Sequence, residues 1–524
     1  MPRVLIADKL SPAAVRIFEE RGLQTDTKTG LSKPELIAII GDYDGLAVRS
    51  ATKVDKDVVA AATKLKVVGR AGIGVDNIDV PAATSAGIVV MNTPFGNSIT
   101  TAEHAIAMMF ALARQLPQAD VSTQAGKWEK NRFMGVELSG KTLGLIGCGN
   151  IGSIVADRAN GLKMKVIAYD PFLSPERAVE LGVEKVELEE LLARADVITL
   201  HTPLTDKTRN ILSRDALART RKGVLIVNCA RGGLVDEAAL RELLDSGHIG
   251  GAAFDVFVEE PAKQNVLFGA SNFIATPHLG ASTLEAQENV ALQVAEQIAD
   301  FLLTGAVTNA LNSPSITADE APKLRPYIGL AERIGAFAGQ MVDEGLRSVE
   351  ILYEGDLARV NVKPLTSAAL AGILRPQLSE VNVVSAPAIA KARGVTVSEA
   401  RQELSPTYDS LMRVSVAFAG GRVDLAGTVI GGAPRIVQIK GMDLDAPFCP
   451  DMLYVNNYDR PGFIGRLGAL FGDAEINIST FYLGRMASGD DAIALVGVDQ
   501  PPDAELLAKV KTLPNVKEVR FLRF

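Results

Sequence analysis

Three segments each place a side chain capable of acid–base or anion-binding chemistry directly after a strand-like run. They read GVLIVNCARGGLVDE, GGAAFDVFVEEP and NFIATPHLGAS, and they supply Arg231, Glu260 and His278. Histidine has a pKa suited to taking a proton from a hydroxyl group near neutral pH. A carboxylate beside its ring would favour imidazolium and hold one tautomer, and the planar arginine fork would bind a carboxylate. The set therefore predicts oxidation of an alcohol that carries an acid group.

Each of these residues also has a structural interpretation. His278 could pack in an apolar loop, Glu260 before Pro261 could lie in a solvated turn, and Arg231 could pair with Asp236. The three residues nevertheless follow one another in an ordered series of strand ends. Open parallel sheets place their ligand sites at the carboxyl ends of strands, so the series favours the catalytic interpretation.

A glycine-rich turn between two strand-like runs predicts a dinucleotide site. In TLGLIGCGNIG an apolar strand is followed by Gly147, Gly149 and Gly152, then by a helix and a second strand that ends at Asp170. The glycines permit a tight turn, the approach of backbone to a pyrophosphate, and close packing of helix on strand. Asp170 would bind both ribose hydroxyls and repel a 2′-phosphate, which favours NAD over NADP. The alternative is a nucleotide-free Rossmann-like turn.

The composition argues against several classes of function. The net charge of −8 lacks the positive excess of a nucleic-acid-binding protein. The three cysteines lie far apart without metal-site spacing, which predicts no metal and suits a reducing compartment. The N-terminus enters a strand directly without a signal peptide, and no apolar run has the length of a membrane span. We therefore expect a cytoplasmic protein without nucleic-acid or membrane partners.

The order of apolar runs predicts an α/β chain with several domains. Strands and helices alternate through the first part, which is typical of parallel sheets with helices on both faces. One long apolar helix is expected over 97–116 and an amphipathic helix over 282–305, followed by the irregular NALNSPSI. From Met452 the chain reads strand, helix, strand, strand, helix, strand, a ferredoxin-like pattern.

We therefore expect two Rossmann-like parallel-sheet domains, then an α+β domain and a ferredoxin-like domain. The predicted boundaries are 1–97 with 285–313 for a discontinuous substrate-binding domain, 98–284 for the NAD-binding domain, 314–450 for an intervening domain and 451–524 for the C-terminal domain.

The ordered motifs GxGxxG, HTPLT, NCARGGLVDE, DVFVEEP and TPHLGAST resemble the D-isomer-specific 2-hydroxyacid dehydrogenases. The resemblance runs nearly end to end and implies the catalytic roles given above. It also implies a set of cofactor contacts along the motifs. These contacts are Gly147, Gly149, Asn150, Ile151, Gly152, Asp170, His201, Thr202, Pro203, Cys229, Ala230, Arg231, Asp255, His278, Gly280 and Ala281.

Further expectations concern two residues near the cofactor and one histidine in a helix. The resemblance implies that Asp255 faces the nicotinamide carboxamide. Cys229 as a nucleophile is an alternative chemistry, although no histidine neighbours it in sequence. His104, in the middle of a helix, is expected to be a packing residue.

The long C-terminal extension narrows the resemblance to members that oxidise 3-phospho-D-glycerate to 3-phosphooxypyruvate, the first step of L-serine biosynthesis. A phosphate needs positive charge beyond one arginine, and the resemblance implies that Arg49 and Arg70 bind it. The backbone at Gly72 to Gly74 would hold the carboxylate, and Arg132 would reach a neighbouring subunit's site. The whole expected substrate set is Arg49, Ser50, Arg70, Gly72, Gly74, Asn97 and Arg132.

Two other functions remain as alternatives. One is another D-2-hydroxyacid dehydrogenase or a hydroxypyruvate reductase. The other is an NAD(H)-sensing corepressor-like binding protein on the same fold, which would bind the cofactor without turnover.

The C-terminal segment resembles an ACT domain, a regulatory module that often pairs across a dimer. The resemblance implies that Asn457, Asp459 and Asn477 bind serine as an allosteric effector, and that the chain forms a homo-oligomer, a tetramer. A helix start could supply amides to a carboxylate. The alternative is a purely structural dimerisation module.

Overall fold

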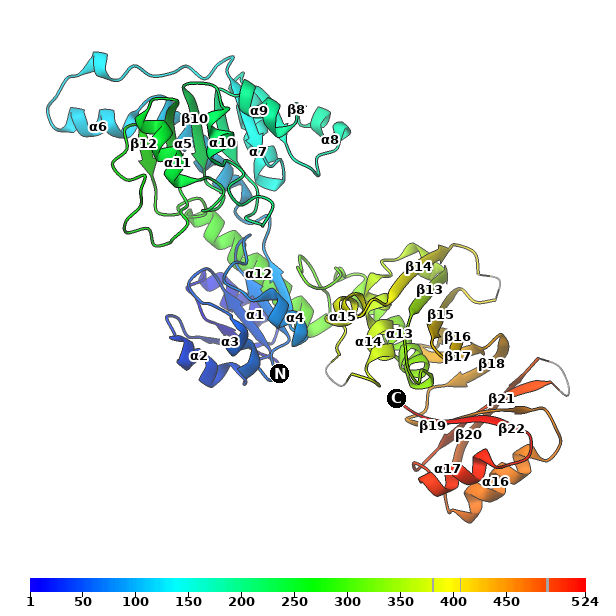
Figure 1. Cartoon of the computed structure of the whole chain (residues 1–524). Coiled ribbons are helices and arrows are strands. Elements are labelled where there is room, and N and C mark those ends of the chain that lie inside the picture. The colour runs from blue at the N-terminus through cyan, green and yellow to red at the C-terminus, as the bar shows by residue number, and fades with distance from the viewer. Residues whose placement is uncertain (379–380, 406, 487–489) are drawn as a thin grey trace.

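The computed structural model describes residues 1–524 except 379–380, 406 and 487–489. The described residues form four sheets, which follow one another along the chain (Figure 1). Two parallel sheets make up the N-terminal part, and a mixed and an antiparallel sheet make up the C-terminal part. The predicted fold class is therefore confirmed.

The first sheet is parallel with the strand order β2-β1-β3-β4-β5. Ser11 caps the first helix and Pro12 occupies its first position, which suits proline because the first N–H groups of a helix have no acceptor within it. The strands are β1 (Arg3–Ile6), β2 (Gln24–Thr27), β3 (Gly45–Val48), β4 (Val67–Arg70) and β5 (Val89–Asn92). The helices are α1 (Pro12–Glu20), α2 (Lys33–Ile40), α3 (Lys56–Ala61) and α4 (Val80–Ser85).

The long helix α12 (Leu284–Thr304) returns from the second sheet and packs on the first (Figure 1). Gly69 in β4 makes room for it, since a Cβ there would lie 2.6 Å from the Cδ1 atom of Ile298. The irregular segment after α12 lies along β5, where the Leu311 amide donates to the Val90 carbonyl at 2.9 Å. Two distant parts of the chain thus build one unit.

The second sheet is also parallel, with the order β12-β11-β10-β9-β6-β7-β8. Its strands are β6 (Thr142–Ile146), β7 (Lys165–Tyr169), β8 (Glu184–Lys185), β9 (Val197–Leu200), β10 (Val224–Asn228), β11 (Ile249–Phe254) and β12 (Phe273–Ala275). Its helices are α5 (Ser98–Ala113), α6 (Leu116–Gln124), α7 (Asn150–Gly161), α8 (Pro175–Glu180), α9 (Leu188–Arg194), α10 (Arg214–Ala218) and α11 (Glu237–Asp245), with a single 3₁₀ turn at Lys130–Arg132.

The apolar helix predicted over 97–116 is shorter than expected. It ends at Ala113, and Gln115 adopts a left-handed φ of 51° before α6 begins. Pro117 explains the break, because proline lacks the N–H of a helix interior but is tolerated in a first turn. The chain beyond α6 projects from the second sheet (Figure 1).

The third sheet is mixed, in the order β14-β13-β15-β16-β17-β18, and only β13 and β14 pair in parallel. Its strands are β13 (Ser348–Gly355), β14 (Thr396–Gln402), β15 (Ser410–Phe418), β16 (Gly421–Ile430), β17 (Ala433–Ile439) and β18 (Met442–Pro447). It carries the helices α13 (Ala321–Met341), α14 (Lys363–Leu374) and α15 (Ala386–Ala392), with a 3₁₀ turn at Asp356–Arg359. This is the expected α+β arrangement.

The fourth sheet has the order β20-β21-β19-β22 and confirms the ferredoxin-like pattern. Its elements are β19 (Asp451–Tyr458), α16 (Phe463–Asp473), β20 (Ile478–Arg485), β21 (Asp491–Val498), α17 (Ala504–Lys511) and β22 (Val516–Arg523). One face of the sheet shares a hydrophobic core with α13, where the Phe337 and Tyr454 rings meet edge to face at 6.0 Å. The third and fourth sheets therefore belong to one packed body.

Candidate active site

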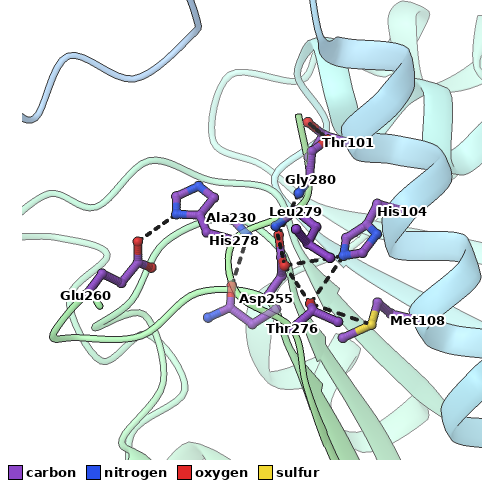
Figure 2. Close-up of polar contacts among 11 residues, drawn as sticks. Thr101, His104, Met108, Ala230, Asp255, Glu260, Thr276, His278, Leu279 and Gly280 are labelled. Atoms are coloured by element: carbon purple, nitrogen blue, oxygen red, sulfur yellow. Dashed lines mark hydrogen bonds and ion pairs between the residues drawn. The ribbon is translucent and has the colours of Figure 1, made fainter. Parts of the chain in front are cut away.

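The predicted histidine–carboxylate pair forms. His278 lies just beyond β12, and its Nδ1 atom is 2.6 Å from the Glu260 Oε2 atom (Figure 2). Because a carboxylate only accepts, Nδ1 carries the hydrogen, and Nε2 holds the lone pair of the neutral ring. The hydrogen bond to Glu260 raises the pKa of His278, against the opposing effect of partial burial. The ring can therefore accept a proton at Nε2 and is stabilised when it does so.

Hydrogen bonds keep the Glu260 carboxylate in place and ionised beside His278. Its Oε1 atom accepts a hydrogen bond from the Phe257 amide at 3.0 Å. Partial burial alone would raise the pKa of Glu260, but the bonds from His278 and Phe257 outweigh it and lower the pKa. Gly232 lets the neighbouring loop approach, since a Cβ there would lie 1.9 Å from the Phe257 carbonyl oxygen. Glu260 therefore stays ionised beside the ring.

The loop that carries His278 is fastened to Asp255, directly after β11. The His278 amide donates to the Asp255 carbonyl at 3.0 Å. The amides of Leu279 and Gly280 donate to the Asp255 carboxylate at 2.7 and 2.8 Å (Figure 2). Both oxygens of the carboxylate expected to face the nicotinamide are thus engaged by this loop. Asp255 therefore anchors the histidine loop.

Arg231 reaches from the second sheet to the first. Asn228 fixes its turn by donating to the Arg231 carbonyl at 2.9 Å and accepting from the Ala230 amide at 3.1 Å. The Arg231 Nε atom is 3.1 Å from the Asp76 carboxylate. A Cβ on Gly74 would lie 1.7 Å from Arg231 Nη2, so the guanidinium lies against the Gly74 backbone.

The alternative partner of Arg231 is engaged elsewhere. Asp236 caps α11 by accepting a hydrogen bond from the Ala239 amide at 3.0 Å. The guanidinium instead lies between the two sheet domains, beside the glycine turn that follows β4. This position faces the predicted substrate residues.

Arg70 joins this cluster of positive charge. Burial, followed by the charge of nearby Arg231, lowers the pKa of Arg70 to about 10, and Arg49 contributes in the same direction. The Nε atom of Arg70 is buried without a hydrogen-bond partner among the described residues. An anion would relieve both the repulsion and the unmet donor. The structure therefore brings Arg49 and Arg231 within electrostatic reach of Arg70.

The loop of Arg49 is preorganised by two residues that the sequence did not single out. Buried Asp8 accepts from the Arg49 amide at 2.6 Å and from the Thr52 hydroxyl at 2.7 Å. Asn77 donates to the carbonyls of Arg49 and Thr52, each at 2.7 Å. Ser50, at the tip of this loop, is exposed. These bonds fix the backbone from which the Arg49 side chain extends.

One amide of the backbone site expected at Gly72 to Gly74 already has a hydrogen-bond partner within the chain. The Gly72 amide donates to the Thr93 hydroxyl at 2.7 Å, so this N–H is not free to bind a carboxylate. Its φ of 144° explains the glycine. Asn97, at the start of α5, has a buried Oδ1 atom without a partner in the described chain, which is consistent with a ligand-facing position.

Arg132 is not brought to this cluster. It lies in the 3₁₀ turn of the segment that projects beyond α6, where its side chain is 62% exposed and pairs with Glu129 at 3.0 Å (Figure 1). Within a single chain it is a surface residue.

The glycine-rich turn fits a dinucleotide. Gly147 has a φ of 95°, and a Cβ on Gly152 would lie 2.2 Å from the Gly147 carbonyl oxygen, so neither position accepts a side chain. Gly149 begins α7 without a side-chain cap, while a Cβ there would meet nothing within 4 Å. The uncapped amides of α7, which include Asn150 and Ile151, are suited to a pyrophosphate.

Asp170 follows β7 beside this turn. Its carboxylate accepts from the Cys148 and Phe172 amides, each at 2.8 Å, and the side chain is thereby fixed next to the glycine loop. A fixed anion here suits ribose hydroxyls and disfavours an added phosphate. These residues therefore fit NAD.

The residues expected at the nicotinamide half line the ends of β9 and β10. Burial lowers the pKa of His201 to about 4, and its buried Nδ1 atom has no partner among the described residues. Burial, then Asp255, raises the pKa of Cys229, so this thiol stays protonated and the nucleophile alternative is disfavoured. Thr202 and Pro203 follow β9, and Ala281 follows the Asp255-bound loop.

The predicted effector residues do not form one cluster within a chain. Asn457 and Asp459 lie at the end of β19, where Asp459 pairs with Arg485 at 3.0 Å. Asn477 precedes β20 and donates to Asp499 at 2.7 Å. Since β21 lies between β19 and β20 and is antiparallel to both, the start of β20 is at the opposite end of the sheet from the end of β19.

Sequence patterns missed the residues that organise the site rather than face it. These residues belong to no recognisable sequence motif, and their roles depend on contacts between separate strand ends. They are Asp8, Asp76, Asn77 and Thr93. His104 was expected to pack, but its Nε2 atom is 3.3 Å from Asp255. Asn228 was detectable, because it stands inside the NCARGG motif.

No helix among the described residues is long and apolar enough to cross a membrane. No group of histidine, cysteine and acidic side chains there is arranged to hold a metal ion.

Sequence comparisons identify relatives over the whole chain. The family model "D-isomer specific 2-hydroxyacid dehydrogenase, NAD binding domain" matches residues 106–280, and "D-3-phosphoglycerate dehydrogenase intervening domain" matches residues 323–440. D-3-phosphoglycerate dehydrogenase of Archaeoglobus fulgidus is 43% identical over 99% of both chains. The Bacillus subtilis protein of the same name is 41% identical and covers 100% of this chain and 99% of its own.

Solved structures resemble the N-terminal part. NAD⁺-bound 3-phosphoglycerate dehydrogenase of Entamoeba histolytica is 32% identical with a TM-score of 0.51, over 60% of this chain and 99% of its own. The TT0316 protein of Thermus thermophilus is 35% identical with a TM-score of 0.55, over 59% of this chain and 99% of its own.

Proposed function

This chain belongs to the D-3-phosphoglycerate dehydrogenases, within the D-isomer-specific 2-hydroxyacid dehydrogenases, and from that premise we propose that it oxidises 3-phospho-D-glycerate to 3-phosphooxypyruvate with NAD, the first step of L-serine biosynthesis. The observation that carries the proposal is the convergence of the His278–Glu260 pair from one sheet with Arg231 and the Arg49–Arg70 cluster between the two sheets. A base and three cations suit a hydroxyacid with two anionic groups.

The residues divide the chemistry among them. When bound between the glycine turn and Asp170, NAD supplies the acceptor for the hydride that leaves the substrate carbon. His278 Nε2 accepts the hydroxyl proton, and the Glu260 carboxylate stabilises the resulting imidazolium. Arg231 holds the substrate carboxylate and polarises the oxygen at the reacting carbon. His278 is thus the base and Arg231 the electrophilic partner.

Arg49 and Arg70 bind the phosphate in this proposal. The lowered pKa and the unmet Nε donor of Arg70 support the assignment, because the phosphate charge would relieve both. Ser50, Asn97 and the backbone near Gly74 complete the substrate side, and Arg132 contributes only from a second copy of the chain.

A substrate panel tests the proposed function. We expect NADH formation with 3-phospho-D-glycerate and far weaker turnover with D-glycerate or D-lactate, because the latter lack the phosphate that the arginines bind. Arg49→Ala should raise KM for the phosphorylated substrate about 10-fold or more with a small change in kcat, as loss of a charge-assisted contact does.

Arg16→Ala, on the exposed face of α1, is the matched control for that variant and should leave KM unchanged. Equal loss on phosphorylated and unphosphorylated substrates would contradict the phosphate assignment. Efficient turnover of glycerate would favour the hydroxypyruvate reductase alternative, and NAD binding without turnover would favour the corepressor-like sensor.

Oligomerisation to a tetramer forms part of the proposal. Large apolar side chains are exposed along α5, α6 and the projecting segment, which is consistent with a surface covered by a second copy. They are Ile99, Phe110, Leu116, Val121, Trp128 and Met134.

Serine regulation through the C-terminal domain also remains a proposal. A site built from Asn457, Asp459 and Asn477 requires two copies of that domain, because the residues lie at opposite ends of one sheet. The three cysteines are free, which suits the proposed cytoplasmic location.

A further inference from the structure

We propose that His104 is a positioning residue for this reaction, acting through Asp255 and Thr276 on the loop that presents His278. The inference rests on the proposed function, because it concerns the base of that same reaction. His104 lies on α5, whereas His278 follows β12, so the contact joins a helix and a strand end that are far apart in the chain (Figure 2).

The geometry determines which atom of His104 donates. Its Nε2 atom is 3.3 Å from both the Asp255 Oδ1 atom and the Thr276 hydroxyl. The Thr276 hydroxyl itself donates to Asp255 Oδ1 at 2.5 Å. An ionised carboxylate only accepts and this hydroxyl has already given its hydrogen, so Nε2 carries the ring hydrogen. The Nε2–H therefore donates to the Thr276 hydroxyl and lies 3.3 Å from the Asp255 carboxylate, so the three groups form a triangle of polar contacts.

The carboxylate in this triangle is a buried charge that needs its donors. The Asp255 side chain is 0% exposed, and the side chain of His104 is only 19% exposed. Burial opposes ionisation of Asp255, and the hydrogen bonds from His104, Thr276 and Leu279 together lower its pKa. His104 is thus one of the groups that keep Asp255 an anion able to hold the loop amides.

The rate of proton transfer depends on where the loop anchored by Asp255 holds His278. The Leu279 and Gly280 amides donate to the Asp255 carboxylate, and these two residues directly follow His278. The His278 amide donates to the Asp255 carbonyl. A shift of this backbone moves the imidazole relative to Glu260 and to the substrate hydroxyl. Because a misplacement of a reacting group by about 1 Å can cost roughly 100-fold in rate, a loosened anchor lowers kcat. No contact of His104 with the substrate is required.

Paired substitutions at His104 test this role. His104→Leu removes the donor, and His104→Gln keeps an N–H that can reach Asp255. With the holoenzyme and 3-phospho-D-glycerate, we expect the leucine variant to lose about 10-fold in kcat, with KM and the Kd for NAD within about twofold of the parent chain. The glutamine variant should recover most of the loss. His248→Gln, whose ring contacts Thr220 at 3.2 Å, is the matched control and should be unaffected.

Three results would overturn the proposal: full kcat in the leucine variant, equal losses in the leucine and glutamine variants, or a change in the Kd for NAD in place of kcat. Thr276→Val provides a second route should His104→Leu fail to fold, since it removes the hydroxyl of the triangle and should also lower kcat without changing KM. Turnover by the unsubstituted chain separates the two hypotheses. If the unsubstituted chain shows no turnover, the proposed function is rejected. If it turns over the substrate and the variants are unaffected, only the role of His104 is rejected.

Discussion

At the scale of single residues, the site depends on pairs of groups that set each other's charge. Glu260 holds the Nδ1 hydrogen of His278 at 2.6 Å and raises the pKa of the ring. Burial lowers the pKa of Arg70, and the charges of Arg231 and Arg49 lower it further. The charges of the first pair compensate each other, whereas the charges of the arginines repel. An anion bound beside Arg70 would therefore be favoured by this repulsion.

The pH dependence of oxidation follows from the first pair. The base must be unprotonated, so kcat/KM should rise as pH rises through the pKa of His278. Because Glu260 raises that pKa, Glu260→Gln should lower it and move the rising limb to lower pH. The plateau should fall by about 100-fold, since the ring also loses its orienting partner.

A pH–rate profile of kcat/KM measures both effects. Glu259→Gln, which removes the exposed neighbouring carboxylate, is the control. A limb that stays in place or moves to higher pH in Glu260→Gln would contradict the coupling of the two side chains.

At the scale of elements, the glycines in the turn between β6 and α7 serve two different purposes, folding and cofactor binding. Gly152 packs so close to the Gly147 carbonyl that a Cβ would lie 2.2 Å from its oxygen. Gly149 has open space around it in the same turn. One glycine therefore serves the packing of helix on strand, and the other leaves room for a ligand.

Alanine substitutions should resolve these two roles. Gly152→Ala should reduce the free energy of unfolding by about 1–3 kcal/mol, because backbone must move to admit the methyl group. Gly149→Ala should keep the parent melting temperature but raise the Kd for NAD about 10-fold, since its methyl group would stand where the pyrophosphate approaches. Thermal unfolding and a fluorescence titration with NADH measure the two quantities. Loss of stability without loss of binding in Gly149→Ala would contradict the assignment.

At the scale of the whole molecule, the catalytic and C-terminal parts bury different hydrophobic clusters, which meet on α13. The second sheet buries clusters of its own, whereas the cluster of the first sheet also includes Ala321 and Leu324 at the start of α13. The third and fourth sheets share one cluster, in which α13 lies against the fourth sheet through Phe337, Tyr454 and Phe524. A change in the C-terminal domain is therefore transmitted first to α13, which follows directly on the catalytic part of the chain.

Phe337→Ala tests this division. Phe337 is 0% exposed, and its loss should destabilise the C-terminal body by about 3–5 kcal/mol, seen as a lower midpoint of one calorimetric transition. The kcat of the dehydrogenase should persist at temperatures below that transition. Ile464→Ala, an exposed position on α16, is the control. A single transition that moves as a whole together with activity would contradict this division.

The sequence was most informative where short-range chemistry decides the structure. The GxGxxG turn and the order of elements in the ferredoxin-like segment were predictable, because glycine turns and periodicity act over a few residues. The end of α5 was not, since the helix was expected to continue to Leu116, whereas Gln115 adopts a left-handed φ of 51° before α6 begins. The distance between Asn477 and Asn457 within one chain could not be predicted either, because it depends on sheet topology.

By itself, then, the sequence determined the kinds of groups present: a histidine with a carboxylate, three arginines and a glycine turn for NAD, each at the end of a strand. Tertiary structure alone decided how they are held. Asp76 meets Arg231 across 155 residues of chain, and His104 on α5 meets Asp255 at the end of β11. Such contacts depend on how separate elements pack, so no local pattern encodes them, whereas the identity of a titratable side chain and its position at a strand end are properties of the sequence alone.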